Sequence, residues 1–179
     1  MTPGSPDAGA RAEPTEQDRG VAPVLVLAVG NVLLGDDGCG QRVLAELAAA
    51  RVGWGFAVEL IDGGTQGMAL LGLLSRRRAL VVLDAVRLGA APGTVHHLRG
   101  QEVFAAVAGR GLTAHEGNAG ELLRSAALLG ELPQEIVVIG VEPERLATEI
   151  GLSPSVAEAV PAAVGLASRV IGELLAACR

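Results

Sequence analysis

Acidic side chains that closely follow apolar runs are the residues in this sequence best suited to chemistry. They are Asp36 and Asp37 after the first run, Asp62 after the second and Asp84 after the third. Carboxylates packed together repel one another, so a cation or a shared proton should hold them. His115, in a Gly-flanked loop further along the chain, adds an imidazole. Two carboxylates and one imidazole form an incomplete ligand set for a divalent transition metal.

Each of these residues also has a purely structural interpretation. Asp36 or Asp37 is a suitable N-cap for the helix that follows, because Asp is favoured there and its charge suits the helix dipole. Asp62, in Asp-Gly-Gly-Thr, can stabilise a turn by bonding its own backbone. Asp84 comes directly after an apolar run, where a structural role is less expected, whereas His115 can be a solvated loop residue.

The remaining histidines and the cysteines have ordinary explanations. His96 and His97 are neighbours in a strand pattern, so at least one faces outward and a surface position is favoured. Cys39 lies near a helix start, which can lower the pKa of a thiol, but a small packing residue is the favoured interpretation. Cys39 and Cys178 are far apart and lack CxxC spacing, which indicates neither a disulfide framework nor structural zinc and favours the reducing cytoplasm.

Apolar runs of strand length alternate with longer helical patterns from about residue 21 onward. The expected strands are 24–29, 56–61, 79–83, 94–98 and 135–141. The expected helices are 39–51, 66–75, 102–108, 119–129 and 155–178, the last with a point of interruption at Pro161. Fully apolar strands are buried on both faces, which predicts a three-layer, doubly wound α/β fold with a mostly parallel five-stranded sheet. Ligands bind at the carboxyl ends of such strands, and the acidic residues converge there if strand 24–29 lies between the next two.

Length and composition restrict the classes of protein. The 179 residues predict one domain over 23–179, preceded by a disordered extension over 1–22 that is rich in Pro, Gly and acidic residues. No signal peptide is recognisable, and no uninterrupted apolar run reaches the ~20 residues that cross a bilayer, so no membrane association is expected. The net charge of −6 and an aromatic content of 2% disfavour nucleic-acid binding. All 14 residues counted as Lys or Arg are Arg, which excludes lysine chemistry.

Familiar catalytic motifs are incomplete here. Gly30 and Gly35 have phosphate-loop spacing, but two acidic residues stand where Lys and Ser or Thr should follow. The GxGxxG, HExxH and GxSxG patterns are missing. A receiver-like signalling domain could use Asp36, Asp37 and Asp84 for phospho-acceptance, but it needs a lysine that this chain lacks. A non-catalytic binding module also stays open on pattern alone.

Five ordered blocks carry a family resemblance over nearly the whole chain from about residue 23. They read VLVLAVGNVLLGDDGCG, IDGGTQGM, VLDAV, APGT and VIGVEP, and GLSPSV precedes the last helix. Together they resemble the maturation endopeptidases of [NiFe] hydrogenases.

The resemblance implies an α/β endopeptidase that removes the C-terminal peptide of the hydrogenase large-subunit precursor after nickel insertion. It implies that Asp37, Asp84 and His115 contact nickel that the substrate itself supplies. Better-known members commonly have Glu where Asp37 stands, and the segment around His115 also differs from common versions. Asp62, in the family's Asp-Gly-Gly-Thr segment, is the candidate for substrate positioning or acid/base assistance.

Overall fold

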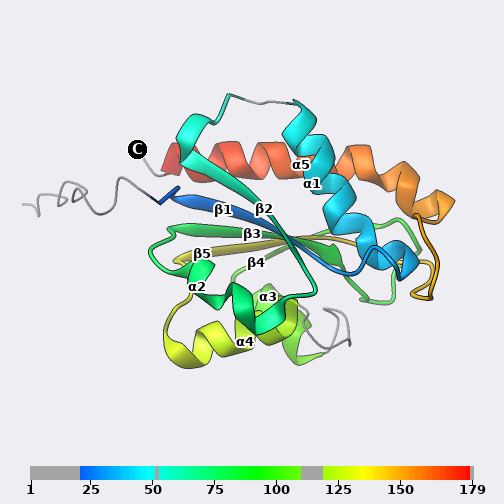
Figure 1. Ribbon diagram of the computed structural model, residues 1–179, viewed down its shortest axis with the longest axis horizontal. Coiled ribbons are helices and arrows are strands. Elements are labelled where there is room, and N and C mark those ends of the chain that lie inside the picture. Colours follow the sequence, from blue (N-terminus) through cyan, green and yellow to red (C-terminus); the bar gives the residue numbers. More distant parts are fainter. Residues whose placement is uncertain (1–20, 51–52, 110–118, 178–179) are drawn as a thin grey trace, which may run out of the picture.

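The computed structural model describes residues 21–50, 53–109 and 119–177, which form a five-stranded sheet between two layers of helices (Figure 1). The strands are β1 (Val24–Val29), β2 (Val58–Gly64), β3 (Ala79–Ala85), β4 (Val95–Arg99) and β5 (Glu135–Val141). The α-helices are α1 (Cys39–Ala50), α2 (Leu71–Leu74), α3 (Gln101–Ala108), α4 (Ala119–Leu129) and α5 (Pro154–Ala177). Short 3-10 turns are η2 (Gly35–Gly38), η3 (Gly55–Ala57) and η4 (Gly67–Leu70).

The sheet has the order β2-β1-β3-β5-β4, so β1 lies between β2 and β3 as the converging-carboxylate hypothesis requires. Four strands are parallel, and β4 runs antiparallel to β5 at one edge. The predicted mostly parallel, doubly wound α/β fold is therefore confirmed. Every residue of β1 and β3 is buried, because helices cover both faces of the central strands.

Side-chain alternation divides the core into two layers. Val24, Val26 and Ala28 point toward α1 and α5, whereas Leu25 and Leu27 point toward η4, α2, α3 and α4. Figure 1 shows these two helix groups on opposite faces of the sheet. With almost no aromatic residues available, both layers are built from Val, Leu, Ile and Ala.

Two predicted elements differ from the structure. The strand expected over 56–61 begins at Val58 and continues through Gly64, because Asp62 and Gly64 pair with β1. Phe56 lies in η3 after Gly55, whose φ is +56°, and its side chain is fully exposed. The helix expected over 66–75 is the turn η4 followed directly by the short α2, so helical structure covers 67–74 but only its second half is α-helical.

Helix α5 is continuous through Pro161, so the expected interruption is absent from it. By length and composition α5 is the one described helix that could cross a membrane. One face of it is nevertheless buried in the core shared with α1 and the sheet, as expected of a core helix in a globular fold. The predicted extension over 1–22 falls almost entirely outside the described residues.

Candidate functional site

The candidate site lies at the carboxyl ends of β1 and β3, where two nearly inaccessible carboxylates are gathered. Asp37 and Asp84 are 3% and 1% exposed. Asp37 follows β1 through the loop 30–36, and Asp84 is the penultimate residue of β3 rather than the residue after it. The structure thus brings these two predicted residues to one edge of the sheet.

Glycines allow the close packing around this edge. A Cβ on Gly30, which has a φ of +135°, would collide with the carbonyl oxygen of Asp37. A Cβ on Gly40, in the first turn of α1, would collide with the carbonyl oxygen of Leu83. Helix α1 therefore begins directly against the strand ends that carry the acidic residues.

Asp84 lies in an environment that disfavours its ionised form. Its Oδ1 accepts a hydrogen bond of 2.8 Å from the backbone N–H of Ala85. Its Oδ2 is buried and accepts no hydrogen bond within the described part of the chain. Burial, and then the negative charge of Asp37, raise the pKa of the Asp84 carboxyl well above its ordinary value. A cation at this oxygen would relieve both effects.

Asp37 is held in place by the loop that leads to it. Its Oδ2 accepts a hydrogen bond of 2.7 Å from the backbone N–H of Asn31. The side-chain Oδ1 of Asn31 in turn accepts a hydrogen bond of 3.0 Å from the backbone N–H of Leu33. The Gly-Asn pair after β1 therefore fixes the orientation of the Asp37 carboxylate.

Asp36 does not join this pair and has a structural role instead. Its Oδ2 accepts hydrogen bonds from the backbone N–H groups of Glu144 and Arg145, at 2.9 and 3.0 Å. Ser153 donates through its backbone N–H to Oδ1 and through its hydroxyl to Oδ2, at 2.7 and 2.9 Å. Burial alone would raise the pKa of Asp36, but these bonds lower it below the ordinary value. Asp36 lies in η2, the 3-10 turn that leads into α1, and its carboxylate bonds to the segment 144–153, so these contacts give it a bridging role and not a capping one.

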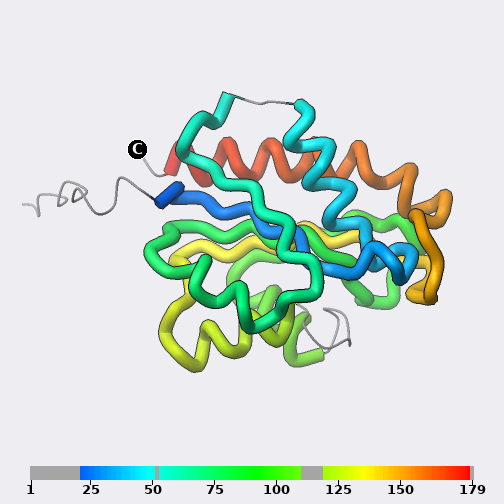
Figure 2. Tube along the Cα trace, in the orientation of Figure 1, coloured from blue at the N-terminus to red at the C-terminus, as the bar shows by residue number. Residues whose placement is uncertain are grey.

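The Asp36 contacts join segments that are distant in sequence. Figure 2 shows the segment before α5 alongside the loop after β1. A parallel bridge between Leu34 and Glu149 adds to this junction. The N–H of Gly35 donates to the carbonyl of Glu149 at 2.8 Å, and the N–H of Glu149 donates to the carbonyl of Leu33 at 3.0 Å. The loop carrying Asp37 is thus fastened to the segment 144–153.

Asp62 lies on β2, paired with Ala28 of β1, and its side chain is exposed. Its Oδ1 accepts the N–H of Gly64 at 3.0 Å, so the turn-stabilising interpretation is confirmed. One strand separates it from Asp84, which places their Cα atoms about 10 Å apart. His115 lies outside the described residues.

Cys39 is a packing residue and His97 a surface residue, as the sequence favoured. Burial, and then the charges of Asp84, Asp37 and Asp36, raise the pKa of the Cys39 thiol well above its ordinary value. The thiol packs in the core with 1% exposure, and burial outweighs any effect of its place at the start of α1. His97 is exposed on β4.

A Glu–His pair that the residue pattern did not single out lies on the same edge of the sheet as the site. Glu142, 5% exposed, follows β5, and its Oε2 is 2.9 Å from Nε2 of His96. The surface interpretation is therefore wrong for His96, whose side chain is only 13% exposed. Glu142 directly follows an apolar strand just as acidic residues do elsewhere in this chain, and that signal could have found it.

The donor set at the edge suits a cation without completing its coordination. In residues 21–50, 53–109 and 119–177, no three His, Cys, Asp or Glu side chains are placed to hold one metal ion. Asp37 and Asp84 supply two oxygen donors, and the buried Oδ2 of Asp84 accepts nothing else in this part of the chain. The third predicted donor, His115, is not among the described residues.

Fold and site together define a doubly wound α/β protein with a buried acidic site at the carboxyl edge of its sheet. The family model of hydrogenase maturation proteases, HycI, matches residues 42–170. The chain belongs to this family and is a peptidase.

Individual relatives agree with this assignment. The hydrogenase 2 maturation protease of Escherichia coli K12 is 39% identical over 134 residues, which cover 74% of this chain and 80% of that protein. The solved structure of the E. coli hydrogenase maturating endopeptidase HybD has a TM-score of 0.72 at 34% identity, covering 84% of this chain and 92% of that one. The [NiFe] hydrogenase maturation protease HybD from Thermococcus kodakarensis has a TM-score of 0.63 at 29% identity, covering 83% and 98%.

Proposed function

We propose that this peptidase removes the C-terminal peptide from the precursor of the [NiFe] hydrogenase large subunit after nickel has been inserted there. Asp37, Asp84 and His115 contact the nickel that arrives with the substrate. The observation that carries this proposal is the buried Oδ2 of Asp84, beside Asp37 and without a hydrogen-bond donor in the described residues. The protein acts in the cytoplasm, where the precursor is made.

The substrate's metal makes the two carboxylates useful together. In its absence, burial and then the charge of Asp37 raise the pKa of Asp84 and favour a protonated Asp84 carboxyl. A divalent cation stabilises both ionised groups, so the site binds a loaded precursor better than an unloaded one. When bound, the metal supplies recognition and can polarise a carbonyl group or a water molecule.

The two remaining acidic residues have different roles, because Asp36 supports the loop and Asp62 faces the substrate. Asp36 holds the Asp37 loop against the segment 144–153 and is too buried to reach a protein substrate. Asp62 is exposed at the same edge and has a second carboxylate oxygen beyond the one bonded to Gly64. We assign Asp62 to substrate positioning or to acid/base assistance.

The direct test incubates purified protein with nickel-loaded and nickel-free precursor and weighs the products by mass spectrometry. Cleavage confined to the loaded precursor is the expected result. Cleavage of both forms alike would overturn nickel recognition, and an unchanged precursor mass in a stable complex would indicate a binding module. Transfer of a phosphoryl group from a small phosphodonor onto Asp84 would favour a receiver-like domain.

Variants locate the site within the same assay. Asp84→Ala and His115→Ala should keep the fold, as measured by circular dichroism, while unprocessed large subunit accumulates. His97→Ala is the matched control for the imidazole, because His97 is exposed on β4. Normal processing by both site variants would contradict the assignment of the nickel contacts.

A further inference from the structure

The loop after β3 is fixed by a buried carboxylate whose role the proposed chemistry does not explain. Glu142 accepts hydrogen bonds from the backbone N–H groups of Leu88 and Gly89, at 2.9 and 3.2 Å. His96 contributes the third contact, at 2.9 Å. Burial alone would raise the pKa of Glu142, but these partners lower it below the ordinary value, so the carboxylate stays ionised at neutral pH.

Backbone contacts fix both ends of the same loop. Val86 donates to the carbonyl of Val141 at 3.0 Å, and Gly93 donates to the carbonyl of Glu142 at 2.8 Å. The N–H of Glu142 donates to the carbonyl of Thr94 at 2.8 Å. The loop from 86 to 94 is therefore hydrogen-bonded at both ends and at Leu88 and Gly89, although its residues 87–92 are exposed.

This rigid loop forms one wall of a groove of about 490 Å³. The other wall is α3 with the neighbouring part of β4. The groove is lined by Arg87, Leu88, Leu98, Glu102, Ala105, Ala106 and Gly109. Its surface is mostly apolar, and Leu88 is 45% exposed within it. We call it the Arg87 groove.

Arg87 is the cationic side chain of the groove. The groove also contains the carboxylate of Glu102, one of whose oxygens accepts a hydrogen bond of 3.2 Å from the backbone N–H of Arg99 at the start of α3. Arg145, at the same end of the molecule, is paired with Glu149 at 2.8 Å. Arg87 has no carboxylate partner among the residues that the structure describes, although the whole chain carries a net charge of −6.

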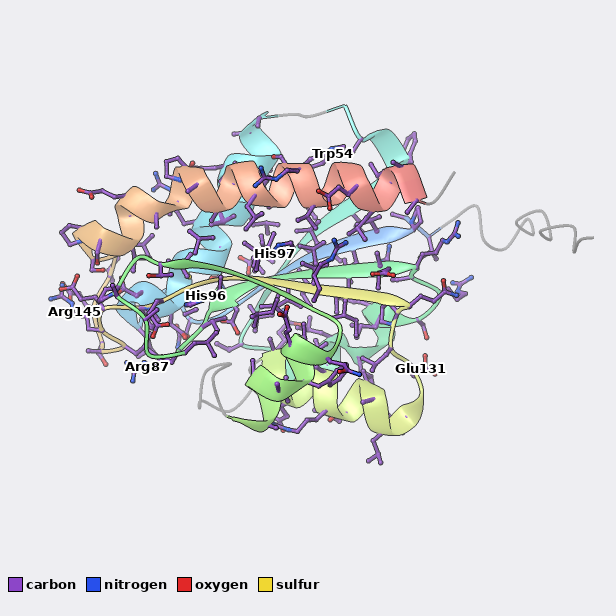
Figure 3. The ribbon with its side chains drawn as sticks, turned by 180° about the vertical axis from the view of Figure 1, so that it is seen from behind. Trp54, Arg87, His96, His97, Glu131 and Arg145 are labelled. Atoms are coloured by element: carbon purple, nitrogen blue, oxygen red, sulfur yellow. The ribbon has the colours of Figure 1, made fainter. Side chains whose placement is uncertain are left out.

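The groove lies close to the acidic site. Arg87 is three residues beyond Asp84 in the chain. Asp84, Gly140 and His96 form one row across β3, β5 and β4, so the Glu142–His96 pair and the site share one edge of the sheet. Figure 3 shows Arg87, His96 and Arg145 toward this end, with Glu131 at the opposite end.

We propose that the Arg87 groove binds a segment of the protein substrate in which a carboxylate is flanked by apolar side chains. A guanidinium group binds a carboxylate through two parallel hydrogen bonds, and the Leu and Ala walls accept the apolar neighbours. Because Glu142 fixes the loop in advance, binding costs little ordering of this wall. The inference rests on the proposed function, since it assumes that the peptidase acts on a protein precursor.

The test measures KM and kcat for cleavage of nickel-loaded precursor by the full-length wild type, Arg87→Gln and Arg87→Lys. Arg87→Gln should raise KM about tenfold with kcat within about twofold, which corresponds to the loss of one charge-assisted contact. Arg87→Lys should recover part of the loss. The control is Arg99→Gln, on β4, whose partner is the exposed Glu173 at 3.4 Å. An unchanged KM for Arg87→Gln, or an equal rise in the control, would overturn the proposal.

A binding measurement separates this inference from the proposed function. Fluorescence anisotropy of a labelled peptide from the C-terminal region of the precursor reports affinity whether or not cleavage occurs. Weaker peptide binding by Arg87→Gln, together with no cleavage of nickel-loaded precursor by the wild type, would support the groove and refute the endopeptidase proposal. Cleavage by the wild type with equal peptide affinity in Arg87→Gln would refute the groove alone.

Glu142 is a positioning residue in this scheme and gives an independent check. Glu142→Gln should weaken peptide binding as Arg87→Gln does, because the loop loses its ionised anchor. The double variant should be no weaker than Arg87→Gln alone, since both changes act through the same guanidinium. Additive losses would show that Glu142 acts elsewhere and would contradict the positioning role.

Discussion

The Oδ1 atom of Asp36 lies 2.7 Å from the backbone nitrogen of Ser153, a residue 117 positions later in the chain. This contact joins the loop after β1 to the residue immediately before α5. Because Asp37 is the next residue, the position of the candidate site depends on a carboxylate that does not belong to it. The same carboxylate also binds Glu144 and Arg145, so one side chain organises most of the 144–153 segment.

Removing the Asp36 carboxylate should therefore destabilise the whole protein. Asp36→Ala leaves three backbone N–H groups and one hydroxyl without their acceptor in a buried setting. We expect a loss of roughly 3–5 kcal/mol in the free energy of unfolding, measured by urea denaturation. Asp62→Ala is the matched control, because its exposed side chain accepts one hydrogen bond and should change stability by less than about 1 kcal/mol. Equal losses in the two variants would contradict the role given to Asp36.

Asp84→Asn should stabilise the protein at neutral pH while it impairs processing. Burial and the charge of Asp37 raise the pKa of Asp84, so the folded state favours the neutral carboxyl. An amide of the same shape removes this cost, and we expect a gain on the order of 1 kcal/mol or more. The measurement is urea unfolding of wild type and variant over a pH series.

The pH dependence has a defined sign. Between the ordinary pKa of 3.8 and the raised value in the folded state, folded Asp84 binds more protons than unfolded Asp84. Wild-type stability therefore loses this contribution as the pH rises through that window, and Asp84→Asn does not. The difference in unfolding free energy between the two proteins should widen as the pH rises above 3.8 and level off only above the raised pKa of folded Asp84. The lowered pKa values of Asp36 and Glu142 act equally in both proteins and cancel. A constant difference would show that Asp84 ionises without cost in the folded protein, and a difference that narrows with rising pH would show that its pKa is lowered; either result would contradict the prediction.

The central strands could be predicted because their residues are apolar without alternation. β5 is observed at 135–141 as expected, and β1 at 24–29, since only a strand covered on both faces has such a pattern. The boundaries of β2 could not be predicted. The apolar Phe56 suggested a strand, whereas Asp62 and Gly64 pair through their backbone, which leaves no hydrophobic signal.

The carboxylates of the site could be predicted only in part. The position of Asp84 at a strand end was visible in the sequence, and its neighbour Asp37 followed from the strand order. The family resemblance singled out Asp37 and not Asp36, but the structural role of Asp36 was not visible in the sequence, because its partners lie more than 100 residues away. Glu142 could have been noticed from its place after an apolar strand, but its role in holding the loop was not visible, since its partners Leu88 and Gly89 precede it by 54 and 53 residues.

Gly40 should tolerate no side chain, although it lies in a helix. A Cβ there would collide with the carbonyl oxygen of Leu83, directly before Asp84. Gly40→Ala should cost about 1–3 kcal/mol of stability, because the backbone of α1 or of β3 must move to make room for the methyl group. Gly165→Ala in α5 is the matched control, since nothing lies within 4 Å of its Cβ position. That change should add roughly 0.5–1 kcal/mol through helix propensity. Thermal denaturation distinguishes the two, and a stabilised Gly40→Ala would refute the close contact.

Cys39 should be inert toward thiol reagents in the folded protein. Reaction needs both access and the thiolate, and this thiol is 1% exposed with a pKa raised well above its ordinary value. In a Cys178→Ser background Cys39 is the sole cysteine, so labelling with a disulfide reagent reports it alone. We expect native labelling to be at least about 100-fold slower than labelling in urea, because it requires local opening.

The cause of this protection can also be tested. Burial is the largest contribution to the raised pKa of Cys39, ahead of the charge of Asp84. Adding Asp84→Asn to the Cys178→Ser background removes that charge and leaves the thiol as deeply buried. The labelling rate of the native protein should therefore not increase. A marked acceleration would mean that the carboxylates, and not the packing of α1 against the strand ends, keep Cys39 unreactive.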